Sequence, residues 1–319
     1  MMGTGGFALP AFEELYETGH EVVGLFTQPA RAGRGHHRHR NPLKDLALQH
    51  ETPVFQPTNV NAREALEQLR ALDSNLCVVA AYGQLLSASL LEIPSHGAIN
   101  LHASLLPKYR GAAPVQYAIL CGESETGVTI FQIEPALDAG PILAVERLTI
   151  GAKETSGELE TRLAQLAAPM TRAVVDAIES ESVVPRVQNT ADVTKAPRLK
   201  KTDGWIDWNR SPAEIDWHVR GMQPWPKACT LLTQESEPPA RLILLEMSEV
   251  AGPSGDSEPQ SPGTVVSTSD QRLVVQAGGG LVEVVRLQPE GKRPMTAADF
   301  LRGHAVRPGN LLWGDGGVA

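Results

Sequence analysis

The sequence is poor in cysteine and in long apolar runs, and each shortage excludes a class of protein. Cys77, Cys121 and Cys229 stand far apart, so neither a disulfide framework nor a structural zinc site is expected. No apolar run approaches the roughly 20 residues that a membrane-spanning helix needs. The first ten residues, MMGTGGFALP, lack the basic segment, apolar core and cleavage site of a signal peptide. We therefore expect a cytoplasmic protein with no metal site and no membrane partner.

Positive charge is also scarce, with one exception. The chain of 319 residues carries a formal net charge of −9, so its surface as a whole does not attract nucleic acid. Residues 31–40, RAGRGHHRHR, nevertheless contain four arginines and three histidines. Such a run can be a solvated loop, or it can bind phosphates through Arg31, Arg34, Arg38 and Arg40. The composition of the run leaves both interpretations open.

The first half of the chain alternates short apolar segments with helical patterns. The predicted strands are residues 21–26, 53–55, 76–81, 97–103 and 126–133. The predicted helices are Pro10–Thr18, Asn61–Leu72 and Pro114–Cys121. Apolar strands that alternate with helices are typical of a mostly parallel sheet covered on both faces. This pattern predicts an α/β domain over residues 1–185.

The second half changes character after one long helix. Thr155–Ser180 is a predicted helix with an apolar stripe, and Pro169 within it predicts a kink or a break. Residues 186–204 lose this periodicity and are interpreted as a linker. Residues 205–319 show short strands without long helices between them, which predicts a small barrel or sandwich. These strands are residues 227–232, 240–247, 263–267, 272–276 and 281–287.

A candidate catalytic site lies at the end of the predicted strand 97–103. Asn100 and His102 are two positions apart, and side chains at that spacing share one face of a strand. The chain then leaves regular structure at Leu106–Pro107, and ligands of α/β sheets bind beyond the carboxyl ends of the strands. A single histidine near a strand is more often structural, so this segment does not decide the role of His102.

A second segment adds a carboxylate. Asp138 lies in a turn-rich loop after the next strand, where it could simply cap a turn. A parallel sheet could instead bring it beside Asn100 and His102. The set would then suit acyl transfer to an amine, with amide and imidazolium stabilising the oxyanion and the carboxylate orienting the imidazole and assisting proton removal. Ser104 is not set in a G-x-S-x-G elbow, so it does not compete as a nucleophile.

These segments resemble the formyltransferase family that uses 10-formyltetrahydrofolate. The resemblance is carried by INLHASLLPKYRGAAPVQYAI (99–119) and ETGVTIFQIEPALDAGPIL (125–143). The family's Asn–His–Asp signature falls on Asn100, His102 and Asp138, and the resemblance implies that they are catalytic. It also implies a Rossmann-like N-terminal domain and a C-terminal barrel of the OB type.

The resemblance further implies the ligands. The positions that match the family's folate segments are Ser104, Leu105, Leu106, Pro107, Tyr82 and Gly83. Residues 27–44 look like a loop of the family member that formylates methionine on initiator tRNA, with Arg34 in the matching Gly-Arg-Gly. Residues 196–215, 223–228 and 287–303 resemble the tRNA-holding domain of that member. Formyl transfer from the folate to the methionine amino group, by a monomer without metal, is the activity implied.

One departure from the family concerns the start of the chain. The family's first strand precedes an M-G-T turn, whereas this sequence begins at that turn. We therefore expect the opening strand to be missing, with unpaired positions at the centre of the sheet and a true start upstream. Two alternatives remain: formyl transfer to a small amine, such as an amino-sugar nucleotide or a purine precursor, and an RNA-binding protein whose catalytic domain is inactive.

The basic run generates a first prediction. Replacing Arg34 with alanine is expected to weaken the use of tRNA, because one phosphate contact would be lost. The measurement is the initial rate of formyl transfer as the concentration of charged tRNA is varied. Kinetics that do not change would identify the run as a solvated loop.

Overall fold

The computed structural model describes residues 1–29, 41–234, 237–250 and 260–314. The chain forms two compact units. Unit 1 comprises Met1–Val115, Glu125–Ile150 and Glu158–Arg198, and unit 2 comprises Gln116–Ser124, Gly151–Gly157 and Leu199–Ala319. The expected domain boundaries after residues 185 and 204 stay predictions. Among the described residues, no helix is both long and apolar enough to cross a membrane.

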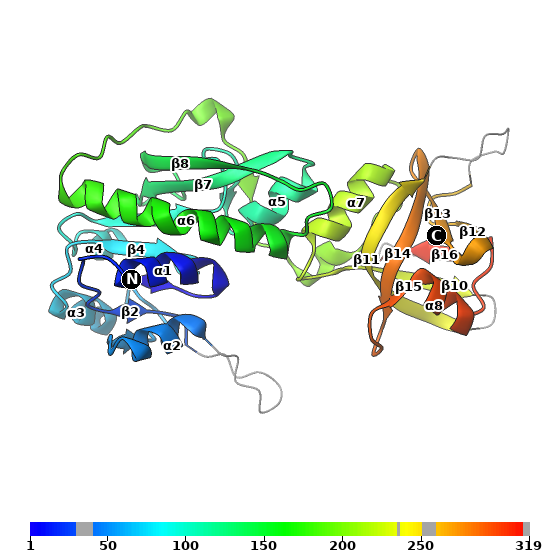
Figure 1. The fold of residues 1–319 in the computed structure, drawn as a ribbon, viewed down its shortest axis with the longest axis horizontal. Coiled ribbons are helices and arrows are strands. Elements are labelled where there is room, and N and C mark those ends of the chain that lie inside the picture. The colour runs from blue at the N-terminus through cyan, green and yellow to red at the C-terminus, as the bar shows by residue number, and fades with distance from the viewer. Residues whose placement is uncertain (30–40, 235–236, 251–259, 315–319) are drawn as a thin grey trace. The chain divides into compact units, whose positions relative to one another are not determined.

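Unit 1 is built on a seven-stranded sheet (Figure 1). In sheet order its strands are β3 (Val54–Phe55), β2 (Leu25–Phe26), β1 (Met2–Gly3), β4 (Cys77–Ala80), β5 (Ala98–His102), β7 (Glu125–Gln132) and β8 (Ile142–Thr149). Neighbours from β3 to β5 pair in parallel, whereas β7 and β8 are antiparallel to their neighbours. The prediction of a mostly parallel α/β sheet is thus confirmed.

The expectation of a missing opening strand is corrected by β1. Met2 pairs with Phe26 on one side and with Val79 on the other, and Gly3 pairs with Ala80. The Met2 side chain is fully buried. Strand β1 pairs with only the last two of the four residues of β4, so the expected unpaired positions on that side are Cys77 and Val78. The shortness of β1 explains why the apolar pattern did not reveal it.

The helices of unit 1 follow the predicted positions with two additions. The helices are α1 (Leu9–Tyr16), α2 (Pro42–Gln49), α3 (Arg63–Ala71), α4 (Ala88–Leu91) and α6 (Ser156–Glu179), and α5 (Pro114–Leu120) begins here and ends in unit 2. Helices α2 and α4 were not expected. Helix α6 continues through Pro169, so the chain does not break there, and the alternative of a kink stays a prediction. Its buried side chains on both sides of the proline, such as Leu163 and Val174, pack into the core and offset the lost hydrogen bond.

Unit 2 is a nearly closed antiparallel barrel, as the alternating strands predicted. Its sheet order is β12 (Val265–Ser267), β13 (Leu273–Ala277), β14 (Gly280–Pro289), β11 (Glu237–Val250), β10 (Ala228–Gln234) and β16 (Leu311–Trp313), with β15 (Met295–Thr296) beside β14. A bridge between Thr264 and Leu311 joins the two ends of this order. Two helices that the sequence did not indicate, α7 (Pro212–Gly221) and α8 (Ala297–Gly303), complete the unit.

The chain after α6 returns along unit 1 instead of leaving it. We call residues 186–196 the return segment. Its first residue, Arg186, exchanges two backbone hydrogen bonds with Ile142 at the start of β8. Its last two residues form β9 (Lys195–Ala196), which pairs in parallel with β6 (Arg110–Gly111). Residues 186–196 are therefore bound to strands of unit 1.

The packing of α6 yields a prediction. Replacing the fully buried Leu163 with alanine is expected to lower the free energy of unfolding by about 2–5 kcal/mol, because it removes buried methyl groups and leaves a cavity. Urea unfolding followed by circular dichroism measures this. Gln165→Ala, at an exposed position of the same helix, is the control and should change stability by under about 0.5 kcal/mol. Equal effects would contradict the packing described.

Candidate active site

Strand β5 presents Asn100 and His102 near its carboxyl end. In the pairing with β7, Asn100 lies opposite Phe131 and His102 lies opposite Thr129. The edge of the His102 ring faces Phe131, with 6.3 Å between ring centroids, and the side chain is only 5% exposed. Asn100 is half-buried. Within the described part of the chain its amide has no hydrogen-bond partner, which leaves it available to a ligand.

A backbone carbonyl fixes the tautomer of His102. Its Nε2 lies 3.0 Å from the carbonyl oxygen of Tyr109. A carbonyl can only accept, so Nε2 carries a hydrogen and donates it. In the neutral ring, Nδ1 is then left with a free lone pair. Burial lowers the pKa of His102, and the charge of Arg110 lowers it further, whereas Asp138 and the bond to Tyr109 raise it. The net lowering favours the neutral form.

Asp138 faces that free nitrogen across a short gap. Its Oδ2 lies 3.9 Å from His102 Nδ1, which is too long for a hydrogen bond. The same oxygen accepts a hydrogen bond of 2.7 Å from the backbone N–H of Gly111. The carboxylate is 12% exposed, and the backbone of Asp138 has a φ of 47°. The two groups therefore face each other in a nearly buried site without a direct hydrogen bond between them.

Asp138 reaches His102 by a different path from the one expected. Strand β7 is antiparallel to β5, so the carboxyl end of β7 lies beside the amino end of β5, away from His102. Residues 133–141, which we call the Asp138 loop, fold back to bring the carboxylate to the carboxyl end of β5. The sequence indicated that the two residues could meet, but a parallel neighbour was the wrong reason.

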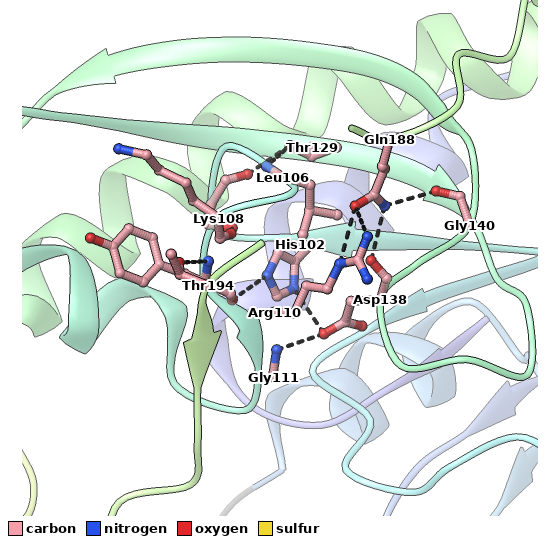
Figure 2. Close-up of polar contacts among 12 residues, drawn as sticks. His102, Leu106, Lys108, Arg110, Gly111, Thr129, Asp138, Gly140, Gln188 and Thr194 are labelled. Atoms are coloured by element: carbon pink, nitrogen blue, oxygen red, sulfur yellow. Dashed lines mark hydrogen bonds and ion pairs between the residues drawn. The ribbon is translucent and has the colours of Figure 1, made fainter. Parts of the chain in front are cut away.

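The Asp138 loop is fastened by two residues that sequence reasoning did not single out (Figure 2). Gln188, from the return segment, donates from Nε2 to the carbonyl oxygens of Asp138 and Gly140 at 2.9 and 2.8 Å. Its Oε1 accepts from Nε and Nη2 of Arg110 at 3.2 and 2.6 Å. A glutamine in an aperiodic segment carries no signal of its own. The bridge between Arg186 and Ile142 and the pairing of β9 with β6 bring it to the site.

The positions predicted to bind the folate lie at the carboxyl ends of the adjacent strands β4 and β5. Ser104 is buried, and its hydroxyl donates to the carbonyl of Lys108 at 2.7 Å. The N–H of Leu106 donates to Thr129 Oγ1 at 3.1 Å, which anchors this turn to β7. Leu105 and Pro107 are half-buried beside Leu106, and Leu106–Pro107 is a cis peptide bond. These bonds order the turn, and its role in folate binding stays a prediction.

Tyr82 and Gly83 follow β4 directly. The Tyr82 ring is buried among apolar side chains, and its hydroxyl has no hydrogen-bond partner among the described residues. Burial raises the pKa of Tyr82 to about 12. Gly83 has a φ of 79°. Arg31, Arg34, Arg38 and Arg40, the predicted tRNA contacts, lie outside the described residues. No cluster of three potential metal ligands occurs among the residues described.

Comparison with known proteins defines the class of this site. A family model described as "Formyl transferase" matches residues 1–176, and one described as "Formyl transferase, C-terminal domain" matches residues 198–305. The chain belongs to the formyl transferase family. A relative from Alkaliphilus oremlandii is 40% identical over 98% of both chains, and one from Geobacter sulfurreducens is 39% identical over 99% of this chain and 97% of its own. Both are named methionyl-tRNA formyltransferase, and this chain is a formyltransferase of that group.

Solved structures support the fold. An N-formyltransferase from Helicobacter canadensis, in complex with folinic acid and dTDP-3-aminofucose, superposes with a TM-score of 0.65 at 15% identity, covering 89% of this chain and 97% of that one. HypX from Aquifex aeolicus, in complex with tetrahydrofolic acid, has a TM-score of 0.56 at 14% identity and covers 80% of this chain and 43% of that one. At these identities the likeness shows the fold alone.

The charges around His102 generate a prediction. Replacing Asp138 with asparagine is expected to lower the pKa of His102 further, because the carboxylate is the main charge that raises it. NMR titration of the ¹⁵N-labelled imidazole measures this directly. Glu134→Gln, which removes an exposed carboxylate from the same loop, is the matched control and should leave the titration in place. A rise in the pKa on loss of Asp138 would contradict the electrostatic arrangement.

Proposed function

We propose that the chain transfers the formyl group of 10-formyltetrahydrofolate to the α-amino group of methionine esterified to initiator tRNA, giving N-formylmethionyl-tRNA. The observation that carries the reaction is the juxtaposition of a neutral, buried His102 with Asp138, beside the Asn100 amide, which has no hydrogen-bond partner among the described residues. The choice of substrate is supported by full-length relatives named for it, at about 40% identity.

The first step is attack by the unprotonated amine on the formyl carbon. A carbon–nitrogen bond forms, and the formyl oxygen takes up the negative charge. The Asn100 amide donates to that oxyanion, which is the type of stabilisation that lowers barriers to acyl transfer most. A site that excludes most water strengthens this contact, and the burial of His102 indicates such a site.

His102 handles the proton that the amine gives up. Nε2 is already a donor to Tyr109, so Nδ1 is the nitrogen that can accept. The Asp138 carboxylate, 3.9 Å away, stabilises the imidazolium that results. The imidazolium then returns the proton to N10 of the folate as the bond from N10 to the formyl carbon breaks. The charged ring thus exists only during the reaction, whereas the resting ring is neutral.

The remaining assignments are also proposals. The SLLP turn and Tyr82–Gly83 hold the folate at the carboxyl ends of β4 and β5. The four arginines of residues 31–40 contact the tRNA, and the barrel of unit 2 helps hold it. The protein acts as a cytoplasmic monomer without a metal ion.

The two alternatives have less support. The small-amine alternative is supported only by a shared fold, because this chain is 15% identical to the N-formyltransferase that was solved with dTDP-3-aminofucose. The alternative of an inactive catalytic domain rested on a missing first strand. Strand β1 is paired on both sides, so that reason no longer stands.

Formyl transfer to initiator and to elongator methionyl-tRNA, each with 10-formyltetrahydrofolate, tests the proposal. Transfer to the initiator alone is the expected result. The Asp138→Asn variant is expected to lose about 10²- to 10⁴-fold in kcat, the usual range for a group that assists proton transfer, with unchanged circular dichroism. Glu134→Gln serves as the control. Transfer to an amino-sugar nucleotide but not to tRNA would support the small-amine alternative, and near-normal turnover without Asp138 would refute its role.

A further inference from the structure

We propose that Gln188 is a positioning residue for formyl transfer, which holds the Asp138 carboxylate at its working distance from His102 by fastening the Asp138 loop to Arg110. The proposal rests on the function proposed above. Gln188 lies in the return segment, and its four side-chain hydrogen bonds go to Arg110 and to two loop carbonyls, not to His102 or the Asp138 carboxylate. Its effect on the reaction would therefore be transmitted through the backbone that it binds.

The first argument is that the Gln188 amide is fully used within unit 1. Both bonds donated from its Nε2 go to carbonyls of the Asp138 loop, and its Oε1 accepts both bonds from Arg110. The side chain is only 5% exposed. A buried amide with every partner present has one orientation, because rotating it by 180° would set N–H groups against the guanidinium and oxygen against carbonyls. The amide is thus a rigid link between two loops.

The second argument is that the Asp138 loop has a backbone that needs support. Asp138 adopts a φ of 47°, which costs free energy for a residue other than glycine. At Gly140 an added Cβ would lie 1.8 Å from the carbonyl oxygen of Gln132, so the loop approaches β7 too closely for a side chain. Gln188 binds the carbonyls of these same two residues, Asp138 and Gly140. Gln188 therefore supports the loop at the residue with the costly φ and at the residue that closely approaches β7.

The third argument is that Gln188 binds, through its Oε1, the segment that orients His102. Arg110 follows Tyr109, whose carbonyl binds His102 Nε2, and precedes Gly111, whose N–H binds Asp138 Oδ2. The backbone of Arg110 is itself held by the return segment, since its N–H donates to the carbonyl of Thr194 at 2.9 Å. The His102 ring and the Asp138 carboxylate are thus both hydrogen-bonded to the tripeptide 109–111. With no bond between them, their 3.9 Å separation depends on the two loops staying together.

The test uses Gln188→Met in the full chain, a change that keeps the length of the side chain and removes all four hydrogen bonds. We expect kcat to fall about 10- to 100-fold, in line with the loss of up to about 10²-fold when a catalytic group is displaced by about 1 Å, with KM for folate and for tRNA changed less than threefold. The imidazole titration of His102, which also faces Arg110, is expected to move to lower pH, as in Asp138→Asn. If Gln188 served stability alone, its replacement would not lower kcat selectively and would not shift the His102 titration.

Gln276→Met is the matched control. Gln276 is similarly buried, at 8% exposure, and its Nε2 also donates to two carbonyls, those of Ala277 and Gly280. It lies in unit 2, and its buried amide bonds to its own strand pair and not to the barrel surface, so kcat at saturating tRNA and the His102 titration should match the wild type. An equal loss of kcat in this control would overturn the proposal, as would a kcat of Gln188→Met within threefold of the wild type.

A second variant covers the case in which Gln188→Met does not fold. Gln188→Glu keeps the acceptor for Arg110 and replaces the donors to the loop with an oxygen, so the same selective loss of kcat is expected. If neither variant folds, Gln188 is a stability residue and the proposal is wrong. If the wild type does not formylate tRNA, the proposed function fails. The His102 titration of Gln188→Met then tests by itself whether Gln188 positions Asp138, and an unshifted titration would overturn that role.

Discussion

The site depends first on the hydrogen bond from His102 Nε2 to the carbonyl of Tyr109. This bond, at 3.0 Å in a buried place, decides which ring nitrogen carries the hydrogen. It thereby turns Nδ1 toward Asp138 as an acceptor. The carbonyl is in position only because Tyr109 adopts a φ of 61°, and its N–H is held by Thr194 Oγ1 at 2.8 Å. A conformation that is costly by itself is thus supported from the return segment.

Burial and charge act on His102 in opposite directions, and their balance suits an amine substrate. Burial has the larger influence and lowers the pKa of His102, whereas Asp138 raises it. The resting imidazole is then neutral and can accept a proton, and the nearby carboxylate still stabilises the charged ring once it forms. A direct ion pair would have held the ring protonated beforehand. The 3.9 Å gap between the two side chains is therefore a feature of the arrangement, not a defect in it.

The architecture explains why so much of the site lies outside regular elements. Because β7 runs antiparallel to β5, the carboxylate has to come back along the sheet on a loop. Loops of this kind lack a ladder of backbone bonds, so side chains must supply the missing partners. The side chain of Gln188 does so here. The return segment meets the same need, because it carries Gln188 to the Asp138 loop.

The sequence by itself determined the α/β class of unit 1, the barrel of unit 2, and the Asn100–His102 spacing on one strand, because apolar periodicity and strand alternation are local properties. Family motifs added Asp138. Only the tertiary structure decided that β1 is paired at the sheet centre, that α6 passes through Pro169, and that Asp138 arrives from an antiparallel neighbour. It also decided the place of Gln188, which comes from a segment without periodicity. Such features depend on contacts between residues far apart in the sequence, such as Gln188 and Asp138, which are 50 positions apart, and no local pattern records them.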